Sequence, residues 1–328
     1  MSRVRPFRYD REAGVFHLLD QRLLPMREVW VQARSAADAA DAIRSMVVRG
    51  APAIGVTAAY GMVLAQRRGE DLPTADHTLR QSRPTAVNLF YALDAMRPHW
   101  GDAKAMLRAA ERVWSEVELT ERAIGLHGAA LLRGQVLTHC NTGPLATGGY
   151  GTALGAIVEA HRQGRVRHVW VDETRPYMQG TRLTTWELGR FGVPYTLITD
   201  SMAAWMMARG EVDAVIIGSD RMAMNGDFAN KIGSYGLAVL ARHHGIPFYT
   251  ALPTTTVDPD LHSGADIPIE QRDADELRCF GEHRMAGPEV PVANPAFDIT
   301  PHRLLTGIVT ERGVLYPPFD EALRGALD

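Results

Sequence analysis

Apolar residues recur at spacings of three and four through most of the first 125 positions, the period of helices that bury one face. The stretches 35–48, 51–66, 86–97 and 102–125 combine this spacing with good helix formers, and short turns containing Gly or Pro separate them. The pattern predicts a mainly helical N-terminal region. Because the uncharged run 51–66 is too short for a membrane span and contains Pro, Gly and Gln, we expect a buried helix there.

After about Gln135 the pattern changes to short β-branched or apolar runs, each followed by a loop and an amphipathic stretch. This alternation is typical of a parallel sheet with helices on both faces. We expect strands at 135–139, 166–171, 194–198, 213–217 and 247–251, and helices beginning near Gly151, Leu183, Ser201 and Ala229. The helix from Ala229 is predicted to end at Gly245 and to bury one face formed by Ile232, Tyr235, Val239 and Leu240.

These elements predict the α/β class. Residues 121–328 form a Rossmann-like doubly wound parallel-sheet domain, and a smaller, mainly helical N-terminal domain in residues 1–120 precedes it. The boundary is expected near residues 118–125, although no linker composition marks it.

The composition, with 46% hydrophobic and 22% charged residues, is that of a globular protein. With 35 basic and 38 acidic side chains the formal net charge is −3, which gives no positive field for nucleic acid or an anionic membrane. Two cysteines are too few for a disulfide framework, and the first 20 residues lack the apolar segment of an export signal. We therefore expect a cytoplasmic protein that binds neither nucleic acid nor membranes.

The candidate chemistry lies where the predicted strands end, because ligands of open parallel sheets bind outside the carboxyl ends of the strands. Cys140 follows the first strand in the turn Cys-Asn-Thr-Gly, before a glycine-rich segment and a helix. Such a turn and helix start would lower the pKa of the thiol and give a reactive thiolate, whereas a lone cysteine at a strand end is more often a small buried apolar residue. Cys279 has no comparable surroundings and is expected to be structural or incidental.

Asp220 closes the apolar run 213–217 through a Gly-Ser pair. A carboxyl group at the end of a buried strand loses solvation, which raises its pKa and keeps it a proton donor near neutral pH. The alternative is a structural role, as a helix cap or as the partner of Arg221.

Three short segments are suited to binding an anion. Arg49, Gly50 and Ala51 form a compact turn before the helix at 51–66, where an arginine and free N–H groups can hold a phosphate together. Arg83 likewise stands before a predicted helix, and the pair Asn230–Lys231 stands at the start of the helix predicted from Ala229. Each segment alone can also be read as an ordinary helix-entry turn.

The usual signatures of cofactor and metal sites are missing from the sequence. It contains no clean GxGxxG with a following acidic strand end, no GxxxxGK[ST], no HExxH, no CxxC pair and no GxSxG. A nicotinamide cofactor is therefore disfavoured, and an ATP-binding P-loop, a zinc site and an elbow-serine hydrolase have no supporting motif.

Taken in order, several segments resemble the methylthioribose-1-phosphate isomerase family of methionine salvage. They include THCNTGPLATGGYGTALG (138–155), DETRPYMQGTRLTTWEL (172–188), GSDRMAMNGDFANKIGSYGLA (218–238) and NPAFDITPHRLLTGIVTERG (294–313). The likeness extends over nearly the whole chain, because it also covers VVRGAPAIGVTAAYG (47–61) and SRPTAVNLFYALDAM (82–96).

The resemblance implies an aldose–ketose isomerase that converts 5-methylthioribose 1-phosphate to 5-methylthioribulose 1-phosphate without metal or cofactor. It implies Cys140 and Asp220 as catalytic residues. It also implies a homodimer. Residues 201–210, which are rich in Ala and Met, pack either against a partner or in the core, and their composition favours the core. The substrate and phosphate contacts that the resemblance implies are Arg49, Gly50, Ala51, Arg83, Gln179, Asn230 and Lys231.

Some alternatives stay open at this point. Asp220 is expected to protonate the ring oxygen, while Cys140 either acts as a base through an enolate or shapes an apolar site for a hydride shift. Departures from the family pattern at Gly149, Thr181 and Gln271 leave 5-deoxyribose 1-phosphate and ribose 1,5-bisphosphate as substrates to consider. The fold family also resembles regulatory subunits of a translation initiation factor's nucleotide-exchange complex, which carry out no isomerisation.

Overall fold

The computed structural model describes residues 4–84 and 86–327. The chain begins with a three-stranded antiparallel sheet, which the sequence analysis of this mainly helical region did not predict. Its strands are β1 (Phe7–Asp10), β2 (Val15–Leu19) and β3 (Trp30–Ala33). They are four or five residues long and interleave polar with apolar positions, so a search for helical spacing passes over them.

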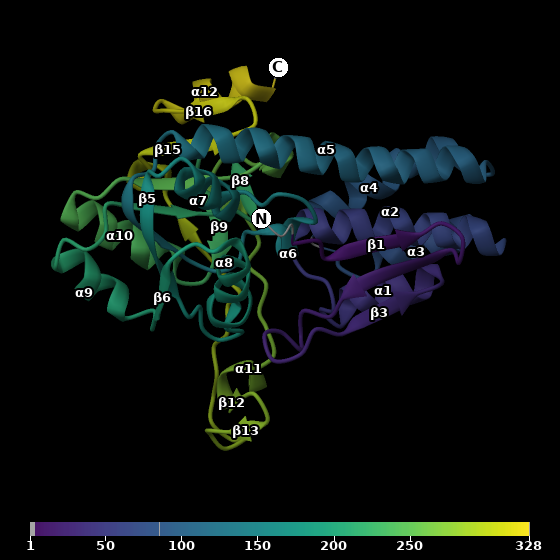
Figure 1. Ribbon diagram of the computed structural model, residues 1–328, viewed down its shortest axis with the longest axis horizontal. Coiled ribbons are helices and arrows are strands. Elements are labelled where there is room, and N and C mark those ends of the chain that lie inside the picture. Colours follow the sequence, from purple (N-terminus) through teal and green to yellow (C-terminus); the bar gives the residue numbers. More distant parts are fainter. Residues whose placement is uncertain (1–3, 85, 328) are drawn as a thin grey trace.

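The helices of the N-terminal half lie against this sheet, at the right of Figure 1. They are α1 (Ala36–Arg44), α2 (Ala51–Arg68), α3 (Leu72–Arg80), α4 (Val87–Met96) and α5 (Ala103–Ala129), with the 3-10 turn η1 (Arg97–His99) between the last two. All but α3 were predicted. The run from Ala53 to Ala65 in α2 is buried at every position, as expected of a helix apolar all round. Phe16 of β2 stacks on Tyr60 of α2 with ring centroids 4.4 Å apart, which joins the sheet to the helices.

A seven-stranded sheet forms the centre of the C-terminal half, in the order β16-β15-β10-β7-β4-β5-β6. Its strands are β4 (Gly134–Thr138), β5 (Val166–Asp172), β6 (Tyr195–Ile198), β7 (Ala214–Ile217), β10 (Phe248–Ala251), β15 (Gly307–Thr310) and β16 (Gly313–Leu315). All pair in parallel except the edge strand β16. The five predicted strands are confirmed, and β15 and β16 extend the sheet at one side.

Helices cover both faces of this sheet, so the Rossmann-like doubly wound prediction is confirmed. One hydrophobic cluster includes Ile124 and Ile157, and a second, on the other face, includes Met207 and Leu237. The helices are α7 (Ala153–Arg162), α8 (Thr185–Phe191), α9 (Met202–Ala208), α10 (Ser234–His244) and α12 (Phe319–Leu327), and the π-helical turn η2 (Gly180–Thr184) leads into α8.

The helix expected to begin at Ala229 begins at Ser234 instead, so that prediction is wrong. Residues 228–231 form a strand of a second sheet, ordered β11-β8-β9-β14. Its strands are β8 (Arg221–Ala223), β9 (Phe228–Lys231), β11 (Val257–Asp258) and β14 (Phe297–Thr300). The predicted buried face of the helix is also wrong, because Tyr235 and Val239 are exposed while Leu237 and Ala238 are buried. Gly245 ends the helix as predicted.

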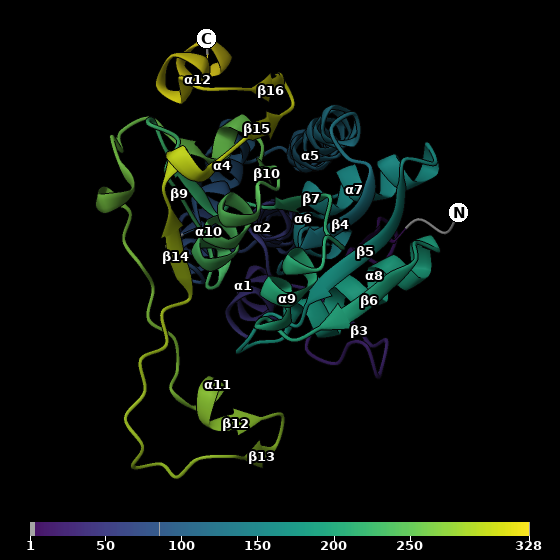
Figure 2. The ribbon, with the colours of Figure 1, turned by 90° about the vertical axis from the view of Figure 1, so that its left-hand side faces the viewer.

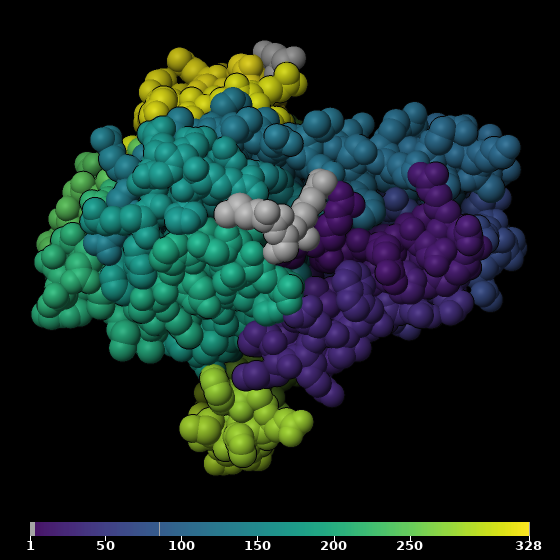
Figure 3. Space-filling view, viewed as in Figure 1, coloured from purple at the N-terminus to yellow at the C-terminus, as the bar shows by residue number. Residues whose placement is uncertain are grey.

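A long excursion of the chain between β11 and β14 stands out from the body (Figures 2 and 3). It carries the 3-10 turn η4 (Gly264–Asp266), then α11 (Asp275–Arg278) and the hairpin of β12 (Cys279–Phe280) and β13 (His283–Arg284). Another 3-10 turn, η3 (Thr254–Thr256), lies just before β11. A further turn, η5 (His302–Leu304), follows β14. A β-bridge between Gln271 and Pro295 joins the two stems of the excursion.

The helix α5 connects the two halves without a break. It contacts α2 on the N-terminal side and α7 and β15 on the C-terminal side. It therefore runs straight through residues 118–125, where the boundary between 1–120 and 121–328 was predicted. Within the described ranges, none of the helices combines the length and the apolar character that crossing a membrane requires.

Candidate active site

A cavity of about 300 Å³ lies between the two halves, at the carboxyl ends of the central strands. Eight of the nine residues singled out from the sequence line it, although they come from segments far apart in the chain. They are Arg49, Gly50, Ala51, Arg83, Cys140, Gln179, Asp220 and Lys231.

Asn230 is the exception among the sequence candidates. Its strand neighbours Ala229 and Lys231 line the cavity, and since side chains alternate along a strand, Asn230 faces the other way. Its amide donates to Ser234 Oγ at 2.8 Å. The sequence analysis placed Asn230 and Lys231 together at a helix start. Both belong to the strand β9 instead, where their side chains point to opposite faces.

Cys140 sits in a strained turn immediately after β4. Its φ is +62°, in the left-handed region that non-glycine residues rarely adopt. Its N–H donates to Thr174 Oγ1 at 2.9 Å, and its carbonyl accepts from Thr184 Oγ1 at 2.6 Å. These two threonines hold the backbone that presents the sulfur.

The expected lowering of the thiol pKa is wrong. Burial raises the pKa of Cys140, and the nearby charges of Arg49 and Lys231 oppose this rise without cancelling it. The short helix α6 (Pro144–Thr147) follows the turn, and its single turn of helix is too weak a dipole to outweigh the loss of water. Cys140 is therefore a thiol at neutral pH, and Cys279 lies on the distant hairpin.

Two further residues at this site share the left-handed conformation. Met46, which lines the cavity, has a φ of +59°, and Thr174, the partner of Cys140, has a φ of +65°. Each such residue costs about 1–2 kcal/mol relative to an ordinary conformation, and clusters of them mark places where side-chain placement is held by the surroundings.

Asp220 lies in the turn between β7 and β8, and its N–H donates to Ala229 O at 2.9 Å. Its side chain has exposed surface because it faces the open cavity, but protein surrounds the cavity and limits its water. Burial accordingly raises the pKa of the carboxyl group, against the opposing charges of Lys231, Arg83 and Arg49. This is the direction predicted for a proton donor. Arg221, its sequence neighbour, approaches Asp258 instead, at 3.7 Å.

Three cations give the cavity a positive wall. Arg49 donates through Nη2 to Asn141 O at 3.1 Å and to Asn141 Oδ1. Lys231 donates to Ala296 O at 2.8 Å, and burial lowers the pKa of its ammonium group. Arg83 stands 3.7 Å from Glu270. Such a wall suits a phosphate group.

Sequence reasoning missed the contribution of the protruding excursion. Glu270, Arg272 and Glu276 line the cavity from its first stem, and Arg272 lies 3.2 Å from Glu270 and 2.6 Å from Glu276. No local motif marks these residues, because the strand β14 that returns the stem to the cavity follows more than 20 positions later.

His139, next to Cys140, is buried beside the site without lining the cavity. Its Nδ1 lies 2.9 Å from Asp172 Oδ2, and its Nε2 lies 2.9 Å from Ile232 O. Because a carbonyl oxygen only accepts, Nε2 carries a proton and the pair with Asp172 shares another. Burial alone would lower the pKa of His139, and Asp172 outweighs it so that the pKa is raised.

With Asp200, these two residues are a group of described side chains whose ligand atoms lie within 4.8 Å of one another and could hold a metal ion. Both nitrogens of His139 are already hydrogen-bonded, however, so a metal ion would have to displace one of these bonds.

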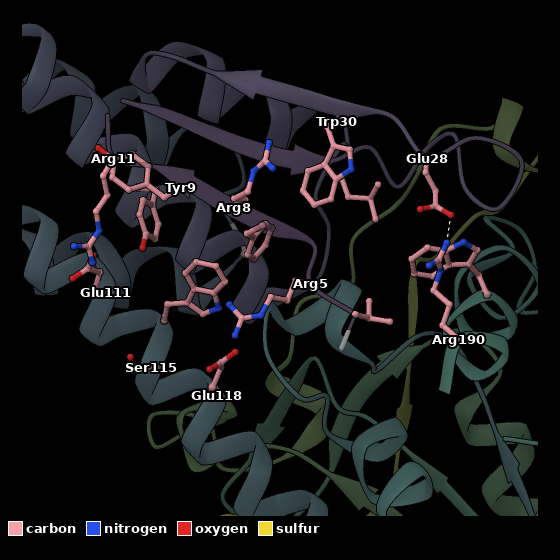
Figure 4. Close-up of a pocket in the computed structure, with 16 residues that line it drawn as sticks. Arg5, Arg8, Tyr9, Arg11, Glu28, Trp30, Glu111, Ser115, Glu118 and Arg190 are labelled. Carbon is pink, nitrogen blue, oxygen red and sulfur yellow. Dashed lines mark hydrogen bonds and ion pairs between the residues drawn. The ribbon is translucent and has the colours of Figure 1, made fainter. Parts of the chain in front are cut away.

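A larger cavity of about 810 Å³ lies elsewhere, between β1, β3 and α5 (Figure 4). Two ion pairs lie along it, Arg11 with Glu111 at 2.5 Å and Arg190 with Glu28. None of the residues singled out from the sequence lines it. The smaller cavity, which gathers a thiol, a carboxyl group and cations held by main-chain carbonyls, is therefore the candidate active site.

Comparison with known proteins agrees with this fold. Residues 47–317 match the model of the initiation factor 2 subunit family. The methylthioribose-1-phosphate isomerase of Thermus thermophilus is 69% identical over 327 residues, which cover 100% of this chain and 99% of the relative.

Two solved structures are similar over the whole chain. The 5-methylthioribose 1-phosphate isomerase of Pyrococcus horikoshii matches with a TM-score of 0.93 and 41% identity, covering 100% of this chain and 96% of the other. The structure described as translation initiation factor eIF-2B, subunit delta, from A. fulgidus matches with a TM-score of 0.87 and 40% identity, over 99% of each chain.

Proposed function

The chain belongs to the initiation factor 2 subunit family, and we propose that within this family it is the isomerase that converts 5-methylthioribose 1-phosphate to 5-methylthioribulose 1-phosphate in methionine salvage. It is an enzyme of the aldose–ketose isomerase class. The observation that carries the proposal is the cavity that joins Cys140 and Asp220 to the cations Arg49, Arg83 and Lys231.

The cations are assigned to the phosphate group of the substrate. Arg49 and Lys231 donate to main-chain carbonyls and an amide oxygen, with no carboxylate in direct contact, so their charge can attract an anion. Gly50 and Ala51, at the start of α2, line the same cavity, where the free N–H groups of a helix start favour an anion. We assign Gln179 to the sugar hydroxyls, because its side chain is buried at the cavity and its Oε1 has no hydrogen-bond partner.

Asp220 is assigned as the acid that opens the sugar ring. The anomeric carbon carries the phosphate, so the ring oxygen has to be protonated before the ring can open. A carboxyl group whose pKa is raised by burial retains its proton closer to neutral pH than an exposed one.

Cys140 is assigned to the hydrogen transfer between C2 and C1. Its raised pKa means that it meets the substrate as a thiol. As a base it would first have to lose its proton, and Arg49 and Lys231 favour the thiolate. In a hydride shift it would instead provide an apolar wall. Transfer of a carbon-bound deuterium distinguishes these routes: exchange with solvent supports the enolate, and retention supports the hydride shift.

The remaining cations of the cavity already lie close to carboxylates, which favours an uncharged 5-substituent over a second phosphate. Arg272 is paired with Glu270 and Glu276, and Arg221 approaches Asp258. A bisphosphate would have to compete with these carboxylates.

We also propose a cytoplasmic homodimer. The two cysteines are both free, in keeping with a reducing compartment. Met202 and Trp205 in residues 201–210 are exposed rather than in the core, which favours their contact with a partner. Light scattering of the purified protein measures the mass, and a monomer at micromolar concentration would contradict the dimer.

A substrate panel tests the function. Purified protein is offered 5-methylthioribose 1-phosphate, 5-deoxyribose 1-phosphate and ribose 1,5-bisphosphate, and ketose formation is measured. We expect the highest kcat/KM with the methylthio sugar, and Cys140→Ser and Asp220→Asn should each lower kcat by at least about 10²-fold. Turnover of none of the sugars would refute the function and favour a regulatory role, whereas near-normal activity of either variant would refute its assignment.

A further inference from the structure

A buried carboxylate stands behind the cavity without lining it. Glu187, in the first turn of α8, is 0% exposed. Its Oε1 accepts the N–H of Leu145 at 2.8 Å, and its Oε2 accepts from Asn141 Nδ2 at 2.5 Å. Burial raises the pKa of this group to about 7, against the hydrogen bonds and the charge of Arg49, which lower it.

Arg49 fixes the direction of the hydrogen bonds that link it through Asn141 to Glu187. Arg49 has only donors, so Asn141 has to turn its Oδ1 toward the guanidinium. Asn141 Nδ2 then faces Glu187, and the same Nδ2 also donates to Thr184 Oγ1 at 3.2 Å. Glu187 has to accept on both oxygens, a requirement that a carboxylate meets and an amide does not.

Arg49 is itself 8% exposed, and its Nε has no hydrogen-bond partner in the described structure. Its charge is therefore held in place largely by Asn141, and the negative charge that balances it on this side is that of Glu187. Thr184, which accepts from Asn141, also donates to the carbonyl of Cys140. The same group of side chains thus reaches both the cation and the thiol of the cavity.

We propose that Glu187 is a positioning residue which, through Asn141, orients Arg49 toward the phosphate group of the substrate. The inference rests on the proposed function for the identity of the substrate, but the orientation of Arg49 follows from the hydrogen bonds alone. A contact with the phosphate is made equally in the bound substrate and in the transition state, so its loss raises KM more than it lowers kcat.

Glu187→Gln is the informative single change, because it keeps the size of the side chain and places a donor against the Asn141 donor. Asn141→Asp with Glu187→Gln restores the bonds to Arg49 and to position 187: the carboxylate introduced at position 141 accepts from both Arg49 and the new amide, whose oxygen still accepts from Leu145 N–H. Only the weaker bond to Thr184 Oγ1 is not replaced. Glu121→Gln is the matched control. Glu121 is also a buried carboxylate with a pKa of about 7, but it accepts N–H groups of Tyr150 and Gly151 away from this cavity.

Steady-state kinetics with 5-methylthioribose 1-phosphate and calorimetric titration with inorganic phosphate are run on all four proteins. Since a hydrogen bond to a charged group changes affinity roughly ten- to hundredfold, Glu187→Gln should raise KM and the Kd for phosphate by at least about tenfold, with kcat within about threefold. The double variant should return both constants to within about threefold of the wild type, and Glu121→Gln should leave them unchanged.

Wild-type constants in Glu187→Gln, or no recovery in the double variant, would overturn the inference. If Glu187→Gln fails to fold, the double variant decides: recovery of folding and KM supports the inference, and failure overturns it. If the wild type turns over no sugar phosphate, the proposed function falls, while the phosphate titrations still judge the role of Glu187.

Discussion

Glu121 gives a sharp prediction for the pH dependence of stability. This residue of α5 is 1% exposed, and burial raises its pKa from 4.5 to about 7. The folded protein therefore binds this proton more tightly than the unfolded chain, by about 3 kcal/mol. The favourable contribution is complete below pH 4.5, is lost as the pH rises to about 7, and is absent at pH 8.

Glu121→Gln removes this titration and keeps an oxygen that can accept the N–H groups of Tyr150 and Gly151. Between pH 4.5 and pH 8 the variant should gain about 3 kcal/mol relative to the wild type. An unfolding entropy of roughly 0.7 kcal/mol/K for a chain of this length converts the gain to a relative rise in Tm of about 4 °C.

Thermal unfolding followed by circular dichroism from pH 4.5 to 8 measures the difference between the two proteins. Every other titrating group is common to both, so it cancels. Parallel Tm curves would refute the reasoning, because they would mean that Glu121 has the same pKa in the folded and unfolded states.

Three further changes test the local geometry. Gly50→Ala should lower stability by at least about 2 kcal/mol and raise KM, because its φ is +96° and a Cβ would stand 2.1 Å from Ala146 O; a Tm and KM like those of the wild type would contradict this. Thr174→Val keeps the shape but leaves the N–H of Cys140 unpaired, so chemical denaturation should show a loss of about 1–3 kcal/mol, and an unchanged midpoint would argue against that bond. Ser35→Ala removes the oxygen that caps α1 and should cost about 1 kcal/mol in the same assay without altering kcat/KM, and a loss of activity would reveal a role that the cap does not explain.

The parallel sheet could be predicted from the sequence because its strands are buried on both faces and read as continuous apolar runs. Residues 213–217 are an example, and β7 covers Ala214–Ile217. The strand β9 could not be predicted in the same way. Phe228–Lys231 becomes a strand because it pairs with β8 on one side and with β14, more than 60 residues later, on the other. The local spacing of apolar residues does not indicate the pairing with β14.

The candidate site could likewise be predicted only in part. Cys140 and Asp220 could be found because strand ends of a parallel sheet meet at one edge. The direction in which the pKa of Cys140 shifts could not be predicted, since it depends on how completely the assembled halves exclude water from the thiol. Glu187 offered one local signal, a charged residue within the apolar Trp-Glu-Leu stretch. Its partners Asn141 and Leu145 could not be predicted, because only the fold brings the turn after β4 against α8.

The single helix α5 has a mechanical consequence. At 1.5 Å per residue its 27 residues form a rod about 40 Å long, and both halves are packed on it. A hinge between the halves would have to bend or break this rod. The spacing between Arg49 in the first half and the thiol and carboxyl groups in the second is thus set during folding. Binding of the sugar phosphate therefore spends little free energy on bringing the two halves together.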